Sequence, residues 1–185
     1  MKTILLVGVP GSGKSSLLKE VIRQTPALSV INYGDAMLEE AATSGITRDT
    51  LRKLPTSAQQ KIGIEAAKKI VQKEVKIALI DTHAWIRTPV GFCPGLPKEV
   101  LNILAPKACA WIECSPSLIL HRRREDPSRN RDAETEEEIA LQQELTRAYL
   151  AACSMETGAL LLCIHNDSPS IENNARPLIE LLQHL

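Results

Sequence analysis

Five short apolar runs recur along the chain, and longer stretches with a helical pattern separate them. The runs occupy residues 3–8, 28–32, 76–81, 108–114 and 159–165. Each is continuously apolar rather than alternating, which is typical of parallel strands that are covered on both faces. Because helical stretches lie between the runs, the first from about Lys14 to Gln24, the pattern predicts a three-layer α/β fold around five parallel strands.

Two of the connections are longer than a plain α/β unit requires. Residues 34–75 contain at least two helical segments, and residues 115–157 contain two helices around the charged stretch REDPSRNRDAETEEE. Extra length of this kind often forms lids and binding subdomains. We expect both to lie at the carboxyl ends of the strands, where open α/β sheets bind ligands. No repeat or low-complexity linker interrupts the pattern, so a single domain over residues 1–185 is expected.

A glycine loop that matches GxxxxGK[ST] at every fixed position follows the first predicted strand and precedes the first predicted helix. In such a loop the backbone amides wrap phosphates, and the helix N-terminus adds partial positive charge. Lys14 would reach the β and γ phosphates of a nucleoside triphosphate, while the Ser15 hydroxyl would bind Mg²⁺. The alternative is a chance glycine turn before a helix. It is the poorer explanation, because both the motif and its place between a strand and a helix match. The predicted nucleotide-binding residues are Gly8, Val9, Pro10, Gly11, Ser12, Gly13, Lys14, Ser15 and Ser16.

Asp81 ends the third apolar run, KIALID. An acid at this place in a P-loop protein holds Mg²⁺ directly or through water. The alternative is a cap on the turn after the strand. With the glycine loop upstream, the sequence predicts a magnesium site that Ser15 and, through water, Asp81 would form.

A basic cluster follows the fourth run and comprises Arg122, Arg123, Arg124, Arg129 and Arg131. The planar guanidinium fork suits phosphate oxygens. A solvated helix face, paired with the glutamates that follow, is the alternative interpretation. Beside a P-loop, an arginine flap explains the cluster better, because phosphoryl transfer needs charge stabilisation and exclusion of water.

Composition narrows the class of function. The 22 lysines and arginines balance 22 aspartates and glutamates, so net charge indicates neither a nucleic-acid nor a membrane partner. Aromatic residues make up 3% of the chain, too few for a base-stacking platform. The N-terminal apolar run is too short for a signal peptide or a membrane span, so a cytoplasmic location is expected. The cysteines form no CxxC pair, and their spacing does not suit a zinc site. Cys109, Cys114 and Cys163 lie in apolar runs, which predicts buried, reduced thiols.

Four segments resemble the archaeal-type adenylate kinases: GVPGSGKSS (8–16), NYGDAML (32–38), DTHAWIRTPVGFCPGLP (81–97) and RNRD (129–132). With the strand spacing between them, the resemblance covers essentially the whole chain. It implies a P-loop kinase fold with a five-stranded parallel sheet, a monophosphate-binding insertion at about 33–75 and a short lid at about 123–134. The implied reaction is the reversible Mg²⁺-dependent transfer of the terminal phosphoryl group from ATP to AMP, which gives two ADP.

The same resemblance implies roles for single residues. Arg52 looks like the arginine of the monophosphate insertion, Arg87 like the basic residue that meets the acceptor phosphate. Asp81 would order the waters of Mg²⁺, and backbone near Asn166 would frame the base of the triphosphate. The lid arm and the helix that returns from it would supply Arg124, Arg129, Arg131 and Arg147. Archaeal members are commonly trimers, so a homotrimer is implied, and no structural metal is expected because the lid lacks a four-cysteine site.

Two alternatives stay open from the sequence. Another small kinase of the same fold, acting on CMP, UMP or a small alcohol, would share the P-loop. A regulatory protein whose P-loop switches partners belongs to a different class, and the Arg52 insertion with the PGLP loop favours two nucleotide sites over such a switch. His83 follows Asp81 into the expected cleft, where a supporting hydrogen bond is a better interpretation than general-base chemistry.

Overall fold

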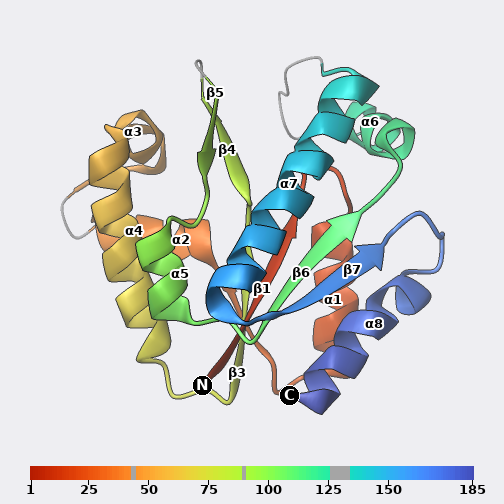
Figure 1. The fold of residues 1–185 in the computed structure, drawn as a ribbon, viewed down its shortest axis with the longest axis horizontal. Helices are drawn as coiled ribbons and strands as arrows, with labels where there is room; N and C mark the ends of the chain where they lie inside the picture. Colours follow the sequence, from red (N-terminus) through yellow and green to blue (C-terminus); the bar gives the residue numbers. More distant parts are fainter. Residues whose placement is uncertain (43–44, 89–90, 126–133) are drawn as a thin grey trace.

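A five-stranded parallel sheet forms the centre of the protein (Figure 1). The computed structural model describes residues 1–42, 45–88, 91–125 and 134–185, with the backbone alone for Arg48, Asp49 and Arg52. The strand order is β2-β3-β1-β6-β7, with β1 (Lys2–Gly8), β2 (Ser29–Asn32), β3 (Ile77–Thr82), β6 (Ala108–Glu113) and β7 (Leu160–His165). Each strand coincides with one of the five apolar runs to within one residue at either end, so the predicted fold class is confirmed.

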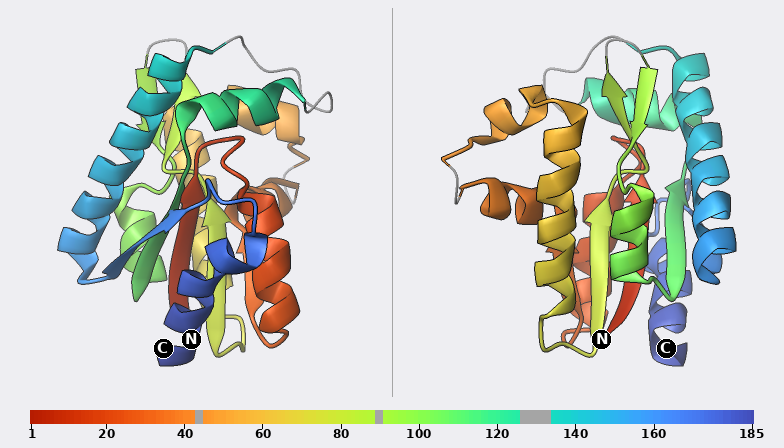
Figure 2. Two further views of the ribbon diagram at one scale, coloured as in Figure 1. Left: turned by 90° about the vertical axis from the view of Figure 1, so that its right-hand side faces the viewer. Right: turned by 60° about the vertical axis from the view of Figure 1, so that its left-hand side comes forward.

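Helices cover both faces of the sheet and make three layers (Figures 1 and 2). One face packs against α1 (Lys14–Gln24) and α8 (Ile171–His184). The other packs against α4 (Thr56–Val71), α5 (Lys98–Leu104) and α7 (Glu136–Thr157). No helix in the described part of the chain is both long and apolar enough to cross a membrane.

The central strand β1 shows why the apolar runs are continuous. Ile4 and Leu6 belong to the core on the side of α1 and α8, whereas Leu5 and Val7 belong to the core on the opposite side. All four side chains are fully buried. Since successive side chains point to opposite faces of a strand, a sheet covered on both sides needs apolar residues at every position.

Both long connections carry extra helices, as the sequence predicts. Between β2 and β3 the chain forms α2 (Tyr33–Ala42), α3 (Arg48–Lys53) and α4, and between β6 and β7 it forms α6 (Pro116–Arg124) and α7. An antiparallel hairpin of β4 (Trp85–Thr88) and β5 (Gly91–Pro94), which the sequence pattern did not predict, follows β3. The hairpin, α3 and α6 lie at the end of the molecule away from both termini (Figure 2).

We expect truncation of Leu5 in the central strand to be costly. Leu5→Ala removes a fully buried side chain and should lower the free energy of unfolding by about 2–5 kcal/mol, because it combines lost burial with a cavity. Urea denaturation measures this difference. Leu160→Ala is the matched control on edge strand β7, where the side chain is 59% exposed, and it should change the free energy by about 0.5 kcal/mol or less. Equal losses for the two variants would contradict the assignment of β1 to the core.

Candidate active site

The glycine loop between β1 and α1 is shaped by two residues in the left-handed region. Gly11 has φ 89° and Gly13 has φ 87°, a conformation that residues with a side chain rarely adopt. A Cβ on Gly13 would also overlap the side-chain amide nitrogen of Asn166. Glycine is therefore required at position 13 both by the backbone angle and by the close approach of its neighbour.

Asn166, directly after β7, holds this loop through a hydrogen bond from its side chain. Its side-chain nitrogen donates to the carbonyl of Ser12 at 2.6 Å, and its side-chain oxygen accepts from Asn174 Nδ2 at 2.7 Å. The guanidinium of Arg122 donates to the carbonyls of Ser12, at 3.4 Å, and of Asn166, at 3.1 Å. Asn166 is almost fully buried, so the loop is held by Asn166 and by Arg122 of α6 rather than by its own residues alone, and Asn174 of α8 in turn holds Asn166.

Lys14 turns back from the start of α1 to the carboxyl end of β3. Its Nζ lies 2.6 Å from Asp81 Oδ1 and donates to the carbonyl of Thr82 at 2.7 Å. Asn32, at the end of β2, donates to the other oxygen of Asp81 at 3.1 Å. Burial lowers the pKa of Lys14, and the adjacent Asp81 carboxylate opposes that effect. The ion pair thus holds a largely buried ammonium group at the mouth of the glycine loop.

Ser15 and Asp81 suit a magnesium ion by the chemistry of their donor atoms. Mg²⁺ binds oxygen ligands, keeps several waters and usually takes one or two groups from the protein. The Ser15 hydroxyl is exposed on the first turn of α1, and the Asp81 carboxylate lines the cleft beside the P-loop. By the chemistry of their oxygen atoms, a hydroxyl and a carboxylate fit Mg²⁺ held partly through water.

A cleft of about 1,100 Å³ opens from the glycine loop. It runs across the end of β3 to the β4–β5 hairpin, and its far wall comes from α2, α3 and α4. Predicted residues that line it are Gly8, Val9, Pro10, Lys14, Asp81, His83 and Arg87. The first long connection and the P-loop therefore face one another across a single cavity.

Two arginines meet at one carboxylate on the wall of this cleft. Arg87 of the hairpin lies 2.9 Å from Glu134, and Arg123 of α6 forms an ion pair with the other oxygen of Glu134. Gln142 of α7 donates to Glu134 at 3.0 Å, and Arg123 also donates to the carbonyl of Pro10 at 2.8 Å. Burial acts to raise the pKa of Glu134, but the hydrogen bonds and charge of Arg123, with those from Gln142 and Arg87, outweigh it and lower the pKa.

Glu134 is held in place by the start of α7. Thr135 caps this helix: its hydroxyl accepts from the backbone of Glu138 at 3.2 Å, and the Glu138 carboxylate accepts from the backbone of Thr135 at 2.9 Å. This reciprocal capping box satisfies two backbone donors at the start of the helix. Glu134 is the residue directly before the cap, so this ordered helix start lies beside the two arginines.

The remaining predicted arginines lie elsewhere or outside the described residues. Arg124 is exposed on α6 and does not line the cleft, and Arg147 of α7 forms an ion pair with Glu113 at the end of β6. Arg52 belongs to α3, but its side chain lies outside what the structure describes, as do Arg129 and Arg131 entirely. The roles that the resemblance implies for these five residues stay predictions.

Three residues of the site have no separate role in the predictions from sequence. Arg123 belongs there to the basic cluster, Glu134 to the glutamates that pair with the cluster in the alternative interpretation, and Asn32 to a segment of the resemblance. Asn32 stands at the end of the second apolar run, which is a recognisable signal for a site residue. Glu134 precedes the capping-box pattern TEEE, but only the fold shows that it meets Arg87 from the hairpin.

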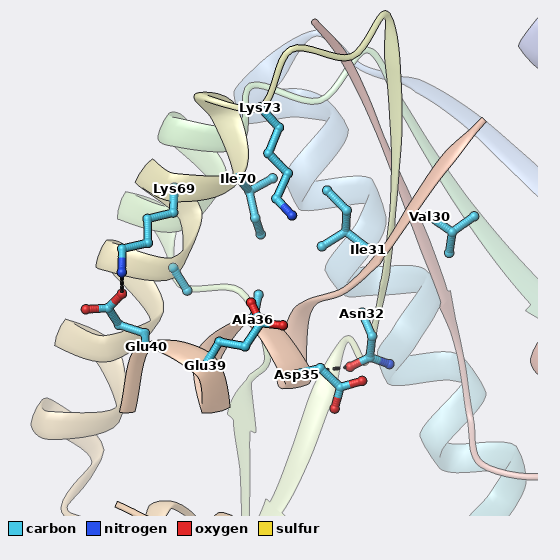
Figure 3. Close-up of a pocket in the computed structure, with 11 residues that line it drawn as sticks. Val30, Ile31, Asn32, Asp35, Ala36, Glu39, Glu40, Lys69, Ile70 and Lys73 are labelled. Atoms are coloured by element: carbon cyan, nitrogen blue, oxygen red, sulfur yellow. Dashed lines mark hydrogen bonds and ion pairs between the residues drawn. The ribbon is translucent and has the colours of Figure 1, made fainter. Parts of the chain in front are cut away.

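A second, smaller cavity of about 310 Å³ lies outside edge strand β2, between α2 and α4 (Figure 3). Lys69 of α4 pairs with Glu40 of α2 at 2.6 Å across one side of it. The side chains of Asp35 and Asn32 lie at its opposite end, where the Asp35 backbone donates to Asn32 at 3.0 Å. Asn32 therefore borders both cavities, but the glycine loop opens only onto the larger one.

Comparison with known proteins finds archaeal relatives that share one named activity and match over nearly the whole chain. A family model described as an AAA domain matches residues 7–140. The adenylate kinase of Pyrococcus furiosus is 42% identical over 185 residues, which cover 97% of this chain and 94% of that protein. The adenylate kinase of Thermococcus onnurineus is 40% identical over 184 residues, with the same coverage, and that of Methanothermobacter thermautotrophicus is 37% identical over 186 residues, covering 99% and 100%.

Solved structures share the fold at low sequence identity. The shikimate kinase of Bacteroides thetaiotaomicron has a TM-score of 0.62 at 16% identity, covering 98% of each chain. That of Aquifex aeolicus has a TM-score of 0.58, also at 16% identity, covering 98% of this chain and 96% of that one. At this identity the likeness supports the P-loop kinase fold alone.

We expect Glu134→Gln to destabilise the protein in a pH-dependent manner. The folded state lowers the pKa of Glu134, so its ion pairs stabilise the protein above the ordinary glutamate pKa of about 4.3, and this stabilisation is lost as pH falls through the lowered value. The variant should therefore melt at a lower temperature than the parent near neutral pH, and the difference should shrink as the pH falls below the ordinary glutamate range.

Thermal melts at a series of pH values, followed by circular dichroism, measure this convergence. Glu144→Gln, at an exposed position on the same helix, is the matched control and should leave the melting temperature nearly unchanged. A Glu134→Gln deficit that stays constant from neutral to acidic pH would show that the carboxylate charge is not what stabilises this corner.

Proposed function

We propose that this chain, which belongs to the adenylate kinase family, catalyses the reversible transfer of the terminal phosphoryl group from ATP to AMP and so forms two ADP. Identity of 37–42% to curated archaeal adenylate kinases over nearly the whole chain supports this activity. The observation that favours it most directly is the continuous cleft of about 1,100 Å³, with the glycine loop at one side and α2, α3 and α4 at the other. Its two walls offer one place for a donor nucleotide and another for an acceptor.

On the donor side, Lys14 is the residue that would neutralise the triphosphate. Its ammonium group already lies at the mouth of the loop, paired with Asp81 at 2.6 Å, and would bind the β and γ phosphate oxygens. Mg²⁺, held by Ser15 and through water by Asp81, would supply further positive charge to the same phosphates. Asp81 would thus exchange its partner, from the Lys14 ammonium to the waters of the ion.

Arg123 and Arg87 are the groups best placed to stabilise charge as the phosphoryl group moves. Arg123 touches the glycine loop through the carbonyl of Pro10, and its Nη2 is buried without a hydrogen-bond partner among the residues that the structure describes. A buried donor of this kind is costly unless an acceptor reaches it, and a phosphate oxygen is a suitable acceptor. Glu134 fixes the position of both arginines and acts as a positioning residue.

The acceptor side would be formed by the first long connection, at about 33–75. Tyr33 of α2 is buried, and its hydroxyl donates to the carbonyl of Gly63 on α4 at 2.9 Å, which joins the two helices of this wall. Gly63 permits the contact, since a Cβ there would lie 2.6 Å from the tyrosine oxygen. The hydrogen bond therefore holds α2 and α4 of this wall together. Arg52, on α3 of the same wall, would meet the monophosphate there.

The finer assignments remain part of this proposal. They comprise AMP as the preferred acceptor, a lid at about 123–134 that brings in Arg124, Arg129 and Arg131, Arg147 and backbone near Asn166 as contacts of the triphosphate, a cytoplasmic location and a homotrimer. CMP, UMP and a small alcohol are the competing acceptors on the same fold. A substrate panel distinguishes them.

A coupled assay with ATP, Mg²⁺ and each of AMP, CMP, UMP and GMP measures acceptor choice. We expect AMP to give the highest kcat/KM. In Lys14→Ala the fold should persist, but kcat/KM with AMP should fall at least about 100-fold, because loss of a single preorganised charge-stabilising donor already costs that much in comparable sites.

Lys19→Ala, at an exposed position on the same helix, is the control and should keep the parent activity. A higher kcat/KM for another monophosphate would replace AMP as the acceptor but keep the site. Parent-like activity in a folded Lys14→Ala protein would contradict the site itself.

A further inference from the structure

Three side chains that commonly bind metal ions converge at the ends of β6 and β7, apart from the cleft. They are Glu113, Cys163 and His165, each of which offers one ligand atom. The parallel register pairs Glu113 with His165, and Cys163 stands two residues earlier on β7. Because residues two apart on a strand point to the same face, all three side chains project from one face of the sheet.

The distances between the ligand atoms suit one tetrahedral ion. Cys163 Sγ lies 3.2 Å from Glu113 Oε2 and 3.7 Å from His165 Nε2, and all three ligand atoms lie within 4.8 Å of one another. In a tetrahedral zinc site the metal–sulfur bond is about 2.3 Å and the bonds to nitrogen and oxygen are about 2.0–2.1 Å, which separates sulfur from each of its neighbours by about 3.5 Å. The third pair, Glu113 and His165, lies within the same 4.8 Å limit.

A fourth residue orients the carboxylate. Arg147 of α7 forms an ion pair with Oε1 of Glu113, which leaves Oε2 directed at Cys163. Metal-binding carboxylates are commonly held in this way by an outer hydrogen-bond donor. Glu113 and Cys163 are half-buried and His165 is exposed, so an ion could enter from solvent and keep a water as its fourth ligand.

We propose that Glu113, Cys163 and His165 bind a single divalent cation of the zinc type, with water completing the coordination. A thiolate and an imidazole favour Zn²⁺ and disfavour Mg²⁺, so this site would be chemically distinct from the magnesium site of the cleft. The spacing of the cysteines can reveal only those zinc sites whose ligands are close together in sequence. Here the pairing of two strands brings Glu113 to residues 163 and 165.

Binding must displace a proton. A metal binds the thiolate form of cysteine, whereas a free thiol is largely protonated at neutral pH. Formation of the sulfur–metal bond therefore releases the proton of the Cys163 thiol to solvent.

The ion would also join the carboxyl ends of β6 and β7 to each other. The backbone of Asn166, the residue that clamps the glycine loop, donates to the carbonyl of Glu113 at 2.8 Å. A ligand that binds the folded state alone raises the melting temperature, so zinc should stabilise the protein.

Isothermal titration calorimetry of the nucleotide-free full chain with Zn²⁺, with Mg²⁺ in large excess, tests the site. We expect one ion per chain, with about one proton released, which titrations in two buffers of different ionisation enthalpy would reveal. Cys163→Ser and His165→Gln should each weaken zinc binding more than about 100-fold, because loss of an outer partner alone already costs roughly 10–100-fold. With Co²⁺ as the probe, the thiolate-to-metal absorption band should appear in the parent and vanish in Cys163→Ser.

Cys93→Ser on β5 and His121→Gln on α6 are matched controls outside the cluster and should keep the parent affinity for zinc. Circular dichroism of each metal-free variant checks the fold, and His165→Gln, whose side chain is exposed, should fold as the parent does. A failure of the parent to bind one Zn²⁺ per chain would overturn the proposal. Undiminished binding in both Cys163→Ser and His165→Gln would overturn it equally.

Discussion

The parallel pairing of β1 with β3 and β6 is the constraint on which the site depends. Its register sets Leu6 beside Asp81 and Val7 beside Thr82, so that the acid at the end of β3 stands level with the start of the glycine loop. Lys14, the first residue of α1 after the glycine loop, contacts both the Asp81 carboxylate and the Thr82 carbonyl. A slip of one residue would move Asp81 to the opposite face of the sheet, and the ion pair would be lost.

At this edge of the sheet, the basic side chains that are expected to bind phosphates form ion pairs with carboxylates. Lys14 rests on Asp81, while Arg87 and Arg123 share Glu134. Each pairing keeps a positive group in place within a partly buried site, where an uncompensated charge is costly. Phosphate oxygens would replace or join these carboxylates as partners, so the charges need little rearrangement when a nucleotide binds. Because each positive group is paired with a carboxylate, a chain of zero net charge can hold several of them at one edge of its sheet.

Much of this architecture could be predicted from the sequence, since the central strands β1, β3 and β6 are largely buried on both faces and all five strands are continuous apolar runs. The glycine loop, Lys14 and Asp81 were found because their chemistry follows from local order along the chain. The β4–β5 hairpin was not predicted, because each strand has only four residues and a mixed pattern, and β5 contains both glycine and proline.

Long-range pairings account for the other misses. Sequence alone does not tell which arginines of α6 face the glycine loop, and the structure brings Arg122 and Arg123 there while Arg124 is exposed. The meeting of Arg87 with Glu134 joins the hairpin to the start of α7, and the meeting of Glu113 with His165 depends on strand register. Such contacts are set by tertiary packing, which local patterns do not encode.

Calorimetry with a bisubstrate ligand, two adenosines joined by a polyphosphate chain, tests most directly whether one cleft holds two nucleotides. If both walls of the cleft bind adenine nucleotides, the ligand should bind once per chain and far more tightly than ATP or AMP alone, because its second half is already held at a high effective concentration. Binding no tighter than that of a single mononucleotide, or a stoichiometry of two ligands per chain, would contradict the account.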